Sequence, residues 1–296
     1  MSRTLYIIGN GFDLANGINT SYNCFREYLL GKVNLCEEEK DFFPIQRNGV
    51  LAPDNSKNAE LIAKMIDSAL SRVYHCKQDW RYFEDVLGRL KYEDLWNDKG
   101  ENELNGILVH IAFTRLRNYF NEWISGIDLE VAKQIKDFQY DEISLFLSFN
   151  YTMTLENIYR VPHDNICHVH GSYGDSELIF GHKEYGDSKY IRESAAERQV
   201  AIVREMLIKN TRACYHKKQD FFTRINREVD RIISIGFSYG DVDLYYIEKI
   251  IANISDDTIW YLHQYKLMDT LRYACKIRKC GVRGKIRMFK DFKVIF

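Results

Sequence analysis

Short apolar runs alternate with amphipathic stretches through the second half of the chain, and this alternation restricts the fold more than any other feature. The runs that we interpret as strands cover residues 143–149, 166–170, 178–180, 231–235, 258–262 and 285–289. Helical periodicity is found at about residues 193–209, 221–229, 242–254 and 266–277. Strands that alternate with helices favour a largely parallel sheet covered by helices on both faces.

One more strand is expected near the beginning of the chain. Residues 5–8 form an apolar run that stops at Gly9-Asn10-Gly11, and residues 20–30 then have the periodicity of a helix that ends at Gly31. Placing this first strand beside the later ones completes the sheet. We therefore predict an α/β fold with a Rossmann-like, mostly parallel sheet.

The region that follows the first helix is helical in pattern as far as about residue 140. Three apolar stripes run through residues 61–73, 80–90 and 104–123. Asp79 is the expected cap of the second stripe, and residues 43–57 are expected to form a loop. The simplest organisation is a single α/β domain over residues 1–296 with a helical insertion at about residues 35–140.

Composition excludes several classes of protein. The 296 residues carry a net charge of −1, which gives no general attraction for nucleic acid or anionic membranes. The 7 cysteines are scattered and odd in number, as expected for free thiols in a reducing compartment. No apolar stretch approaches the ~18 residues of a membrane span, and the first apolar run is too short for a signal peptide. We expect a cytoplasmic protein without membrane contact.

The first strand runs into a Gly9-Asn10-Gly11 turn. Glycines let a backbone turn tightly and approach a phosphate, and amides at a following helix start attract negative charge. The third glycine of the dinucleotide-binding pattern is absent, because Asp13 and Leu14 occupy its expected place. The turn alone is equally consistent with phosphate binding and with a tight connection that binds nothing.

Polar residues also follow the strand at residues 143–149. Asn150 and Thr152 come directly after it. Ligands of open parallel sheets bind just outside the carboxyl ends of the strands, so both side chains are well placed for binding. The alternative is that they only cap the next helix.

His168-Val169-His170-Gly171 closes the strand that begins at residue 166. Alternation places both histidines on one face, and Gly171 leaves room for a ligand. We expect no metal, because no third ligand lies at a recognisable spacing. We interpret His168 as a hydrogen-bonded core residue and His170 as a functional residue suited to general-base chemistry.

The strand at residues 231–235 ends in Gly236-Phe237-Ser238. Gly236 and Ser238 are candidates for contact with the phosphates or ribose of a nucleotide, and Asp241 is expected to cap the next helix. Glycine or polar side chains thus follow four strands of one predicted sheet. Their convergence at one edge predicts a nucleotide site.

Two further features have both a functional and a structural interpretation. Glu84 lies near the edge of a buried helix face, where it could reach a ribose or a histidine, or form an ordinary helix ion pair. His182 is a weaker candidate for the same cleft. The segment from Arg272 to Lys293 is strongly basic, and we favour a solvated helix and edge strand over a nucleic-acid-binding surface.

An ordered set of short motifs runs from the first strand to the Gly236 turn. Its members are Gly9-Asn10-Gly11 with Asp13, Thr20-Ser21-Tyr22, Trp80 with Phe83-Glu84, Phe149 to Thr152 with Leu155-Glu156, His168 to Gly171, and Phe180-Gly181-His182. In order and separation, this set resembles the AbiH family of bacteriophage abortive-infection proteins. The resemblance covers most of the chain.

The AbiH pattern in turn resembles a divergent sirtuin-like NAD-binding domain. The glycine loop, Asn150, His170-Gly171 and the Gly236-x-Ser238 turn match sirtuin segments, the His-Gly pair being catalytic there. Other positions depart from the sirtuin pattern: Asp13 replaces a Ser, Thr20 an Asp, Tyr22 an Arg and Thr152 an Asp. The paired Cys-x-x-Cys motifs of the sirtuin zinc module are absent.

The resemblance implies an antiphage effector that hydrolyses NAD to nicotinamide and ADP-ribose. Asn150 and His170 would be catalytic. Contacts with NAD would come from Gly9, Asn10, Gly11, Asp13, Thr20, Tyr22, Glu84, Thr152, Gly171, Gly236 and Ser238. A homo-oligomer and a trigger from the phage or the defence system are further expectations. The alternatives are a catalytically silent nucleotide sensor that regulates a partner, and an effector that binds nucleic acid.

Overall fold

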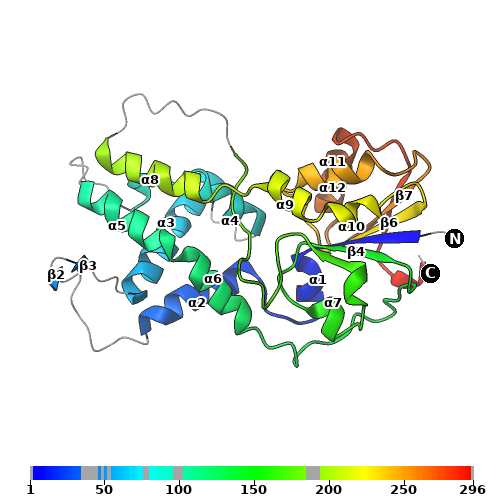
Figure 1. Cartoon of the computed structure of the whole chain (residues 1–296), viewed down its shortest axis with the longest axis horizontal. Coiled ribbons are helices and arrows are strands. Elements are labelled where there is room, and N and C mark those ends of the chain that lie inside the picture. Colours follow the sequence, from blue (N-terminus) through cyan, green and yellow to red (C-terminus); the bar gives the residue numbers. More distant parts are fainter. Residues whose placement is uncertain are drawn as a thin grey trace. The chain divides into compact units, whose positions relative to one another are not determined.

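A computed structural model describes residues 3–34, 46–47, 50–51, 55–75, 80–95, 103–184 and 194–294. The chain divides into two compact units. The sheet unit consists of Met1–Thr20, Ile127–Ile179 and Asn210–Phe296, and the helical unit consists of Ser21–Gly126 and Phe180–Lys209. Figure 1 shows the elements of both.

The sheet unit is built on a six-stranded parallel sheet. Its strands are β1 (Arg3–Ile8), β4 (Leu145–Ser148), β5 (Ile166–His168), β6 (Val229–Ile235), β7 (Ile259–His263) and β8 (Ile286–Phe289). They lie in the order β5-β4-β1-β6-β7-β8, and every neighbouring pair is parallel. Numbered along the chain, this is the order 3-2-1-4-5-6 of doubly wound dinucleotide-binding folds. The predicted Rossmann-like sheet is confirmed.

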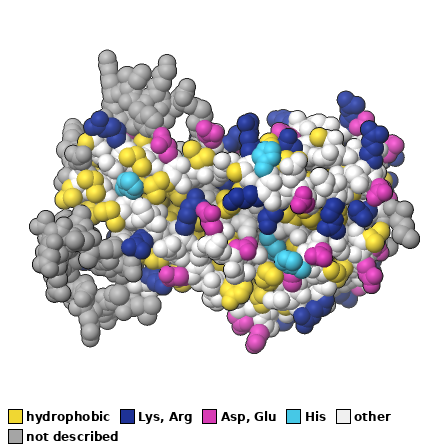
Figure 2. All heavy atoms as spheres, in the orientation of Figure 1, with side chains coloured by type: hydrophobic (Ala, Val, Ile, Leu, Met, Phe, Trp, Pro, Cys, Tyr) yellow, Lys and Arg dark blue, Asp and Glu magenta, His cyan; other side chains and the backbone are white. Residues whose placement is uncertain are grey.

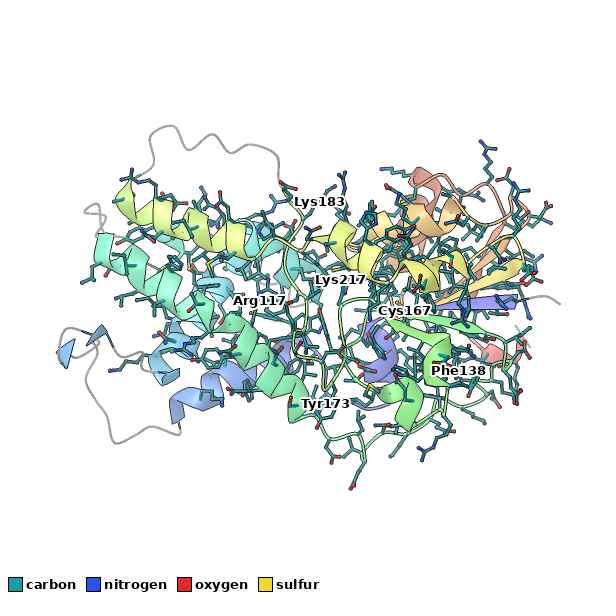
Figure 3. All side chains as sticks on the ribbon, in the orientation of Figure 1. Arg117, Phe138, Cys167, Tyr173, Lys183 and Lys217 are labelled. Atoms are coloured by element: carbon teal, nitrogen blue, oxygen red, sulfur yellow. The ribbon has the colours of Figure 1, made fainter. Side chains whose placement is uncertain are left out.

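Alternating side chains of the strands form a core on each face of the sheet. Leu5 and Ile7 of β1 belong to one cluster, which also holds Cys167, while Tyr6 and Ile8 belong to the other, which also holds Phe138. Cys167 and Phe138 are both labelled in Figure 3. Because both faces are buried, the strands are almost continuously apolar, which is why they were recognisable in the sequence.

Helices cover each face of this sheet. Those of the sheet unit are α1 (Asn10–Ala15), α7 (Thr154–Asn157), α9 (Thr211–Lys217), α10 (Gln219–Thr223), α11 (Leu244–Ile251) and α12 (Leu267–Lys279), with 3-10 turns at His163–Asn165 and Phe292–Val294. Residues of α9 to α12 belong to the cluster with Leu5, and residues of α1 and α7 to the cluster with Tyr6.

The predicted strand at residues 178–180 is wrong. This segment is extended but pairs with loops, because Ile179 donates its N–H to the His170 carbonyl at 2.8 Å and accepts from the Tyr151 hydroxyl at 3.0 Å. Leu178 and Phe180 are buried, which explains the misleading apolar pattern. The predicted helix at residues 221–229 is also wrong in extent, because α10 ends at Thr223 and Val229 begins β6.

The helical unit contains α2 (Tyr22–Asn34), α3 (Asn55–Tyr74), α4 (Trp80–Leu87), α5 (Glu103–Thr114), α6 (Leu116–Ser125) and α8 (Ala195–Met206), with a 3-10 turn at Tyr92–Asp94. The stripe expected over residues 104–123 is therefore two helices, separated at Arg115. A strand pair, β2 (Gln46–Arg47) and β3 (Val50–Leu51), lies within the expected loop at residues 43–57. Asp79 lies outside the described residues.

The sequence predicts that the first long helix ends at Gly31, and this prediction is wrong. The helix continues through it to Asn34, and Gly31 does not adopt a left-handed conformation. A glycine inside a helix costs only about 1 kcal/mol, and packing of the apolar face outweighs that cost. The predicted insertion at residues 35–140 covers α3 to α6, whereas α2 and α8 also belong to the helical unit. None of the helices in the described ranges is long and apolar enough to cross a membrane.

Gly236→Ala should destabilise the sheet unit strongly. Gly236 has a φ of 67°, and a Cβ there would lie 2.2 Å from the Phe12 backbone nitrogen. Strain and backbone displacement should together cost about 2 kcal/mol or more of unfolding free energy, measured by chemical denaturation. Gly240→Ala is the matched control in the same loop, because no atom lies within 4 Å of its Cβ position. Equal denaturation midpoints for the two variants would contradict the proposed contact.

Candidate active site at the carboxyl edge of the sheet

Four loops meet at the carboxyl edge of the parallel sheet. They follow β1, β4, β5 and β6, which are adjacent in the sheet. Strand order reverses between β1 and β6, and ligands of doubly wound folds bind outside the carboxyl ends near such a point. The structure therefore gathers on one edge the loops that carry Asn10, Asn150, His170 and Ser238.

The two glycine turns beside the reversal point contact each other through their backbones. Gly9 donates its N–H to the Ile235 carbonyl and Gly11 donates to the Gly236 carbonyl, each at 3.0 Å. A Cβ on Gly11 would lie 2.7 Å from the Gly236 Cα. These glycines thus allow two turns to pack together, and the amides of Gly9 and Gly11 are already used within the fold.

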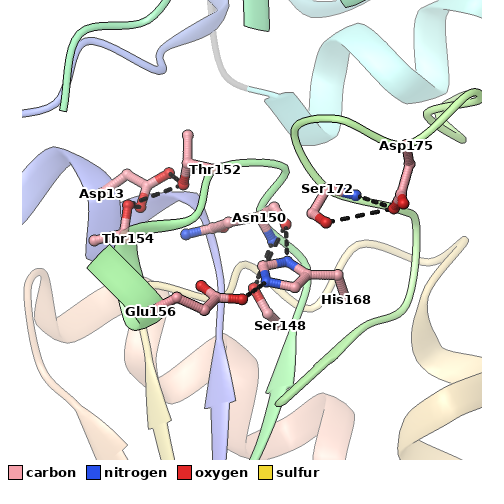
Figure 4. A network of polar contacts seen from close by, with 9 residues as sticks. All are labelled: Asp13, Ser148, Asn150, Thr152, Thr154, Glu156, His168, Ser172 and Asp175. Atoms are coloured by element: carbon pink, nitrogen blue, oxygen red, sulfur yellow. Dashed lines mark hydrogen bonds and ion pairs between the residues drawn. The ribbon is translucent and has the colours of Figure 1, made fainter. Parts of the chain in front are cut away.

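Asp13 is buried on α1 beside the turn that follows β4. Its Oδ2 accepts from the Thr152 hydroxyl at 2.7 Å, and its Oδ1 accepts from the Thr154 hydroxyl at 2.8 Å (Figure 4). Burial raises the pKa of Asp13 to about 6, while hydrogen bonds from Thr152, Thr154 and Asn150 and the charge of His168 lower it. Thr152 is not the helix cap considered from the sequence, because Met153 is the N-cap of α7 and its side chain makes no capping bond.

Asn150 places a buried amide at the centre of this network. The residue is 6% exposed, and its side chain points toward the Asp13 end of the network in Figure 4. The amide is close enough to Asp13 to lower the pKa of that carboxyl. Within the described part of the chain, however, neither Nδ2 nor Oδ1 of Asn150 makes a hydrogen bond of ordinary geometry. A buried amide whose hydrogen bonds do not reach ordinary geometry is costly, which makes it a candidate for ligand contact.

His168 is the hydrogen-bonded core histidine that the sequence predicted. Its Nδ1 lies 2.8 Å from the Asn150 carbonyl oxygen, and its Nε2 lies 2.9 Å from Glu156 Oε1. A carbonyl oxygen only accepts, so Nδ1 donates to Asn150. His168 thus ties the end of β5 to the turn after β4.

His170 is almost fully buried and faces an acid that the sequence analysis missed. Its Nε2 lies 3.3 Å from Asp243 Oδ1, and the two side chains are 2% and 9% exposed. Rings of Phe149, Tyr151 and Tyr246 surround the imidazole, with centroids 5.5, 6.4 and 5.6 Å away. Burial raises the pKa of Tyr246 well above its usual range, so this ring stays neutral. A histidine oriented by a carboxylate is suited to act as a base.

Three further predicted residues lie in the sheet unit. Gly171 follows His170 with a φ of 87°, and a Cβ there would lie 2.9 Å from the Glu177 carbonyl oxygen. Thr20 is buried at the end of the first segment of the unit, whereas Ser238 is half-buried after β6. Asp241 does not cap α11, because it forms an ion pair with Lys276 at 2.6 Å, and Asp243 occupies the cap position.

Two predicted binding residues lie in the helical unit. Tyr22 begins α2 and stacks on Phe83 with ring centroids 4.9 Å apart. Glu84 accepts from Lys209 Nζ at 2.8 Å, a buried ion pair between α4 and the residues that follow α8. His182 is held by two backbone carbonyls of the same unit, those of Lys183 and Arg204, each at 2.7 Å. Each of these side chains has a structural contact inside its own unit.

The basic C-terminal segment carries paired charges. Arg272 faces Asp269 at 3.0 Å, and Lys276 faces Asp241. Acidic and basic side chains are intermixed over the visible face of the sheet unit in Figure 2. Among the described residues, no group of three or more His, Cys, Asp or Glu side chains is arranged to hold a metal ion.

Asp243 and Thr154 are the residues of this network that sequence reasoning did not select, whereas Glu156 entered it only as part of the AbiH motif set. Thr154 and Glu156 follow Asn150 at even spacing, but their partners are Asp13 and His168, which are distant in sequence. Asp243 lies two residues after Asp241, which the pattern favoured as a cap. No local signal separates the two acids, because only the packing of α11 decides which one faces His170.

These features define a doubly wound α/β protein with a buried polar network at the carboxyl edge of its sheet. The sequence from residue 5 to residue 264 matches the model of the family described as bacteriophage abortive infection AbiH. The chain therefore belongs to the AbiH family, which indicates a role in the abortive infection of bacteriophage. No curated protein matches the sequence.

Asp13 should make the stability of the protein depend on pH. Its pKa is about 6 in the folded chain and 3.8 without the fold, so folding favours the protonated form. The stability that this contributes is complete below pH 3.8 and is lost as the pH rises through 6. Relative to Asp13→Asn, wild type should lose up to about 3 kcal/mol of unfolding free energy between pH 4 and pH 7.5.

Urea denaturation of both proteins across this pH range measures the effect. Taking the difference removes the contribution of all other carboxylates, since they are common to both proteins. A difference that stays constant with pH, or that grows in favour of wild type at high pH, would contradict the raised pKa.

Proposed function

We propose that this protein hydrolyses NAD to nicotinamide and ADP-ribose and that loss of NAD halts the growth of an infecting phage. The observation that carries this proposal is that two buried polar groups follow strands at the carboxyl edge of the sheet: the Asn150 amide, which makes no hydrogen bond of ordinary geometry within the described residues, and the His170–Asp243 pair. The strand order of dinucleotide-binding folds supports a nucleotide as the ligand. Similarity to sirtuins in the Asn and His-Gly segments supports the choice of NAD.

Asn150 is suited to hold the ribose next to nicotinamide. Its amide offers a donor, Nδ2, and an acceptor, Oδ1, and both are buried. A hydroxyl group can both donate and accept, so a ribose hydroxyl or a water molecule satisfies both amide atoms. Binding a ligand there would remove the cost of the unmet hydrogen bonds.

His170 is suited to act as the general base. Its Nε2 lies 3.3 Å from Asp243 Oδ1, and the negative charge of this carboxylate favours the proton that the imidazole takes up as a base. In the reaction, water bonds to the anomeric carbon and gives a proton to His170. The bond to nicotinamide breaks with its electron pair on the ring nitrogen. Its transition state has oxocarbenium character, as in glycoside hydrolysis.

The surroundings of His170 are suited to the charged nicotinamide ring. Phe149, Tyr151 and Tyr246 lie around the imidazole, and Phe149 also stacks on Phe237 with centroids 4.1 Å apart. Aromatic faces attract cationic rings and exclude water. Because Gly9 and Gly11 use their amides within the fold, contact with the diphosphate would be made by the partly exposed Asn10 and Ser238.

Purified protein should release nicotinamide from NAD, and His170→Ala or Asn150→Ala should slow this release at least ~100-fold. Chromatography of nicotinamide and ADP-ribose measures the rate, and circular dichroism checks that the variants fold. His216→Ala is a matched control, because this histidine is exposed on α9 and should leave the rate unchanged. Full activity in both site variants would exclude the assignment.

Binding of NAD without turnover would instead favour the sensor hypothesis. Calorimetry with wild type and Asn150→Ala separates the two possibilities. Tight binding that depends on Asn150, with no nicotinamide released even in phage-infected cell extract, would identify a nucleotide sensor.

A further inference from the structure

The turn between β4 and α7 carries Asn150, and two sets of buried hydrogen bonds hold this turn in place. We propose that Asp13 and His168 are positioning residues that hold Asn150 in its place, and that protonation of Asp13 rearranges the contacts by which it does so. The inference rests on the proposed function in one respect, because it takes the Asn150 amide to be the group that contacts the ligand.

The first set of hydrogen bonds joins α1 to residues that follow Asn150. Thr152 and Thr154 each donate a hydroxyl hydrogen to a different oxygen of Asp13, at 2.7 and 2.8 Å. The two hydroxyl oxygens are also 3.0 Å apart. One carboxylate therefore fixes residues two and four positions beyond Asn150, and all three side chains are buried.

The second set of hydrogen bonds joins β5 to Asn150 itself. His168 Nδ1 donates to the Asn150 backbone carbonyl, and Glu156 holds the other imidazole nitrogen from α7. Asn150 also donates its own N–H to the Ser148 hydroxyl at 3.2 Å. The backbone of Asn150 is thus restrained by β4, β5 and α7, whereas its amide makes no ordinary hydrogen bond in the described residues.

This arrangement orients a ligand-binding amide before the ligand arrives. A side chain fixed in its productive position loses little entropy on binding, and a displacement of about 1 Å can cost a reaction ~100-fold in rate. Restraint of the backbone around an amide that makes no ordinary hydrogen bond in the described residues has no evident benefit for stability. It does benefit a site that must place one donor and one acceptor accurately.

Protonation of Asp13 rearranges its contacts with the two threonines. A carboxylate accepts from both hydroxyls, whereas a protonated carboxyl carries a donor on one oxygen, so one of the two threonine hydroxyls must turn and accept from Asp13 instead of donating to it. The pKa of Asp13, about 6, places this change just below neutral pH. The titratable groups near Asp13 are His168, its partner Glu156, and Tyr159 of the turn after α7.

Nuclear magnetic resonance of the Asn150 side-chain amide tests the proposal without any assay of activity. In wild type these signals, assigned by their loss in Asn150→Ala, should shift with pH around a midpoint near 6, and the transition should vanish in Asp13→Asn. Since the hydrogen bond from Thr152 lowers the pKa of Asp13, Thr152→Val should move the midpoint upward. Thr258→Val is the matched control, because its buried hydroxyl bonds to Val229 at the opposite edge of the sheet.

Each result of this titration supports or overturns the proposal. An unchanged midpoint in Asp13→Asn would show that a group other than Asp13 causes the transition and would overturn the role of Asp13. An unmoved or lowered midpoint in Thr152→Val would overturn it as well, and this variant serves if Asp13→Asn does not fold.

Kinetics then separates positioning from general stability. Thr152→Val should lower kcat for NAD hydrolysis at least ~10-fold with little change in KM, and Thr152→Ser, which keeps the hydroxyl, should restore it. A Thr152→Val protein with full kcat would overturn the inference. If wild type releases no nicotinamide, the proposed function fails, and the titration of the Asn150 amide still decides whether Asp13 positions it.

Discussion

Backbone contact between the Gly9–Gly11 turn and Gly236 is the constraint on which the carboxyl edge of the sheet depends. β1 and β6 are neighbours at the point where strand order reverses, and their loops approach so closely that a Cβ on any of the three glycines would meet backbone atoms within 3 Å. The amides that a dinucleotide-binding loop offers to phosphate are used here to join two turns. Polar groups suited to a ligand are consequently displaced toward β4 and β5, where Asn150 and His170 lie.

Most of the sheet could be predicted from the sequence because its burial leaves a strong local signal. The strands β1, β4, β5, β6, β7 and β8 are all apolar runs close to where the pattern placed them. Burial without strand pairing gives the same signal, which is why residues 178–180 were misread. Gly31 shows the reverse case, because a residue that commonly ends helices does not end α2, whose buried face before Gly31 holds Tyr22, Phe25 and Leu29.

The candidate site was less predictable because its geometry depends on residues distant in sequence. Spacing alone located Asn150, His168 and His170 at strand ends, and the interpretation of His168 as a core residue is confirmed by its two hydrogen bonds. Contact between Asp13 and Thr152 joins positions 139 residues apart. Asp243 faces His170 only because α11 packs on the same side of the sheet, and no single-sequence pattern records such packing.

Buried polar groups around Asn150 show why this edge of the sheet differs from the rest of the core. Burying Asp13 raises its pKa, so its ionised form weakens the fold at neutral pH, and the Asn150 amide adds the cost of unmet hydrogen bonds. An apolar residue at either position would avoid these costs. Proteins commonly bury such unfavourable polar groups where a ligand must be bound. Asp13 and Asn150 lie at the carboxyl edge of the sheet, which is where doubly wound folds bind their ligands.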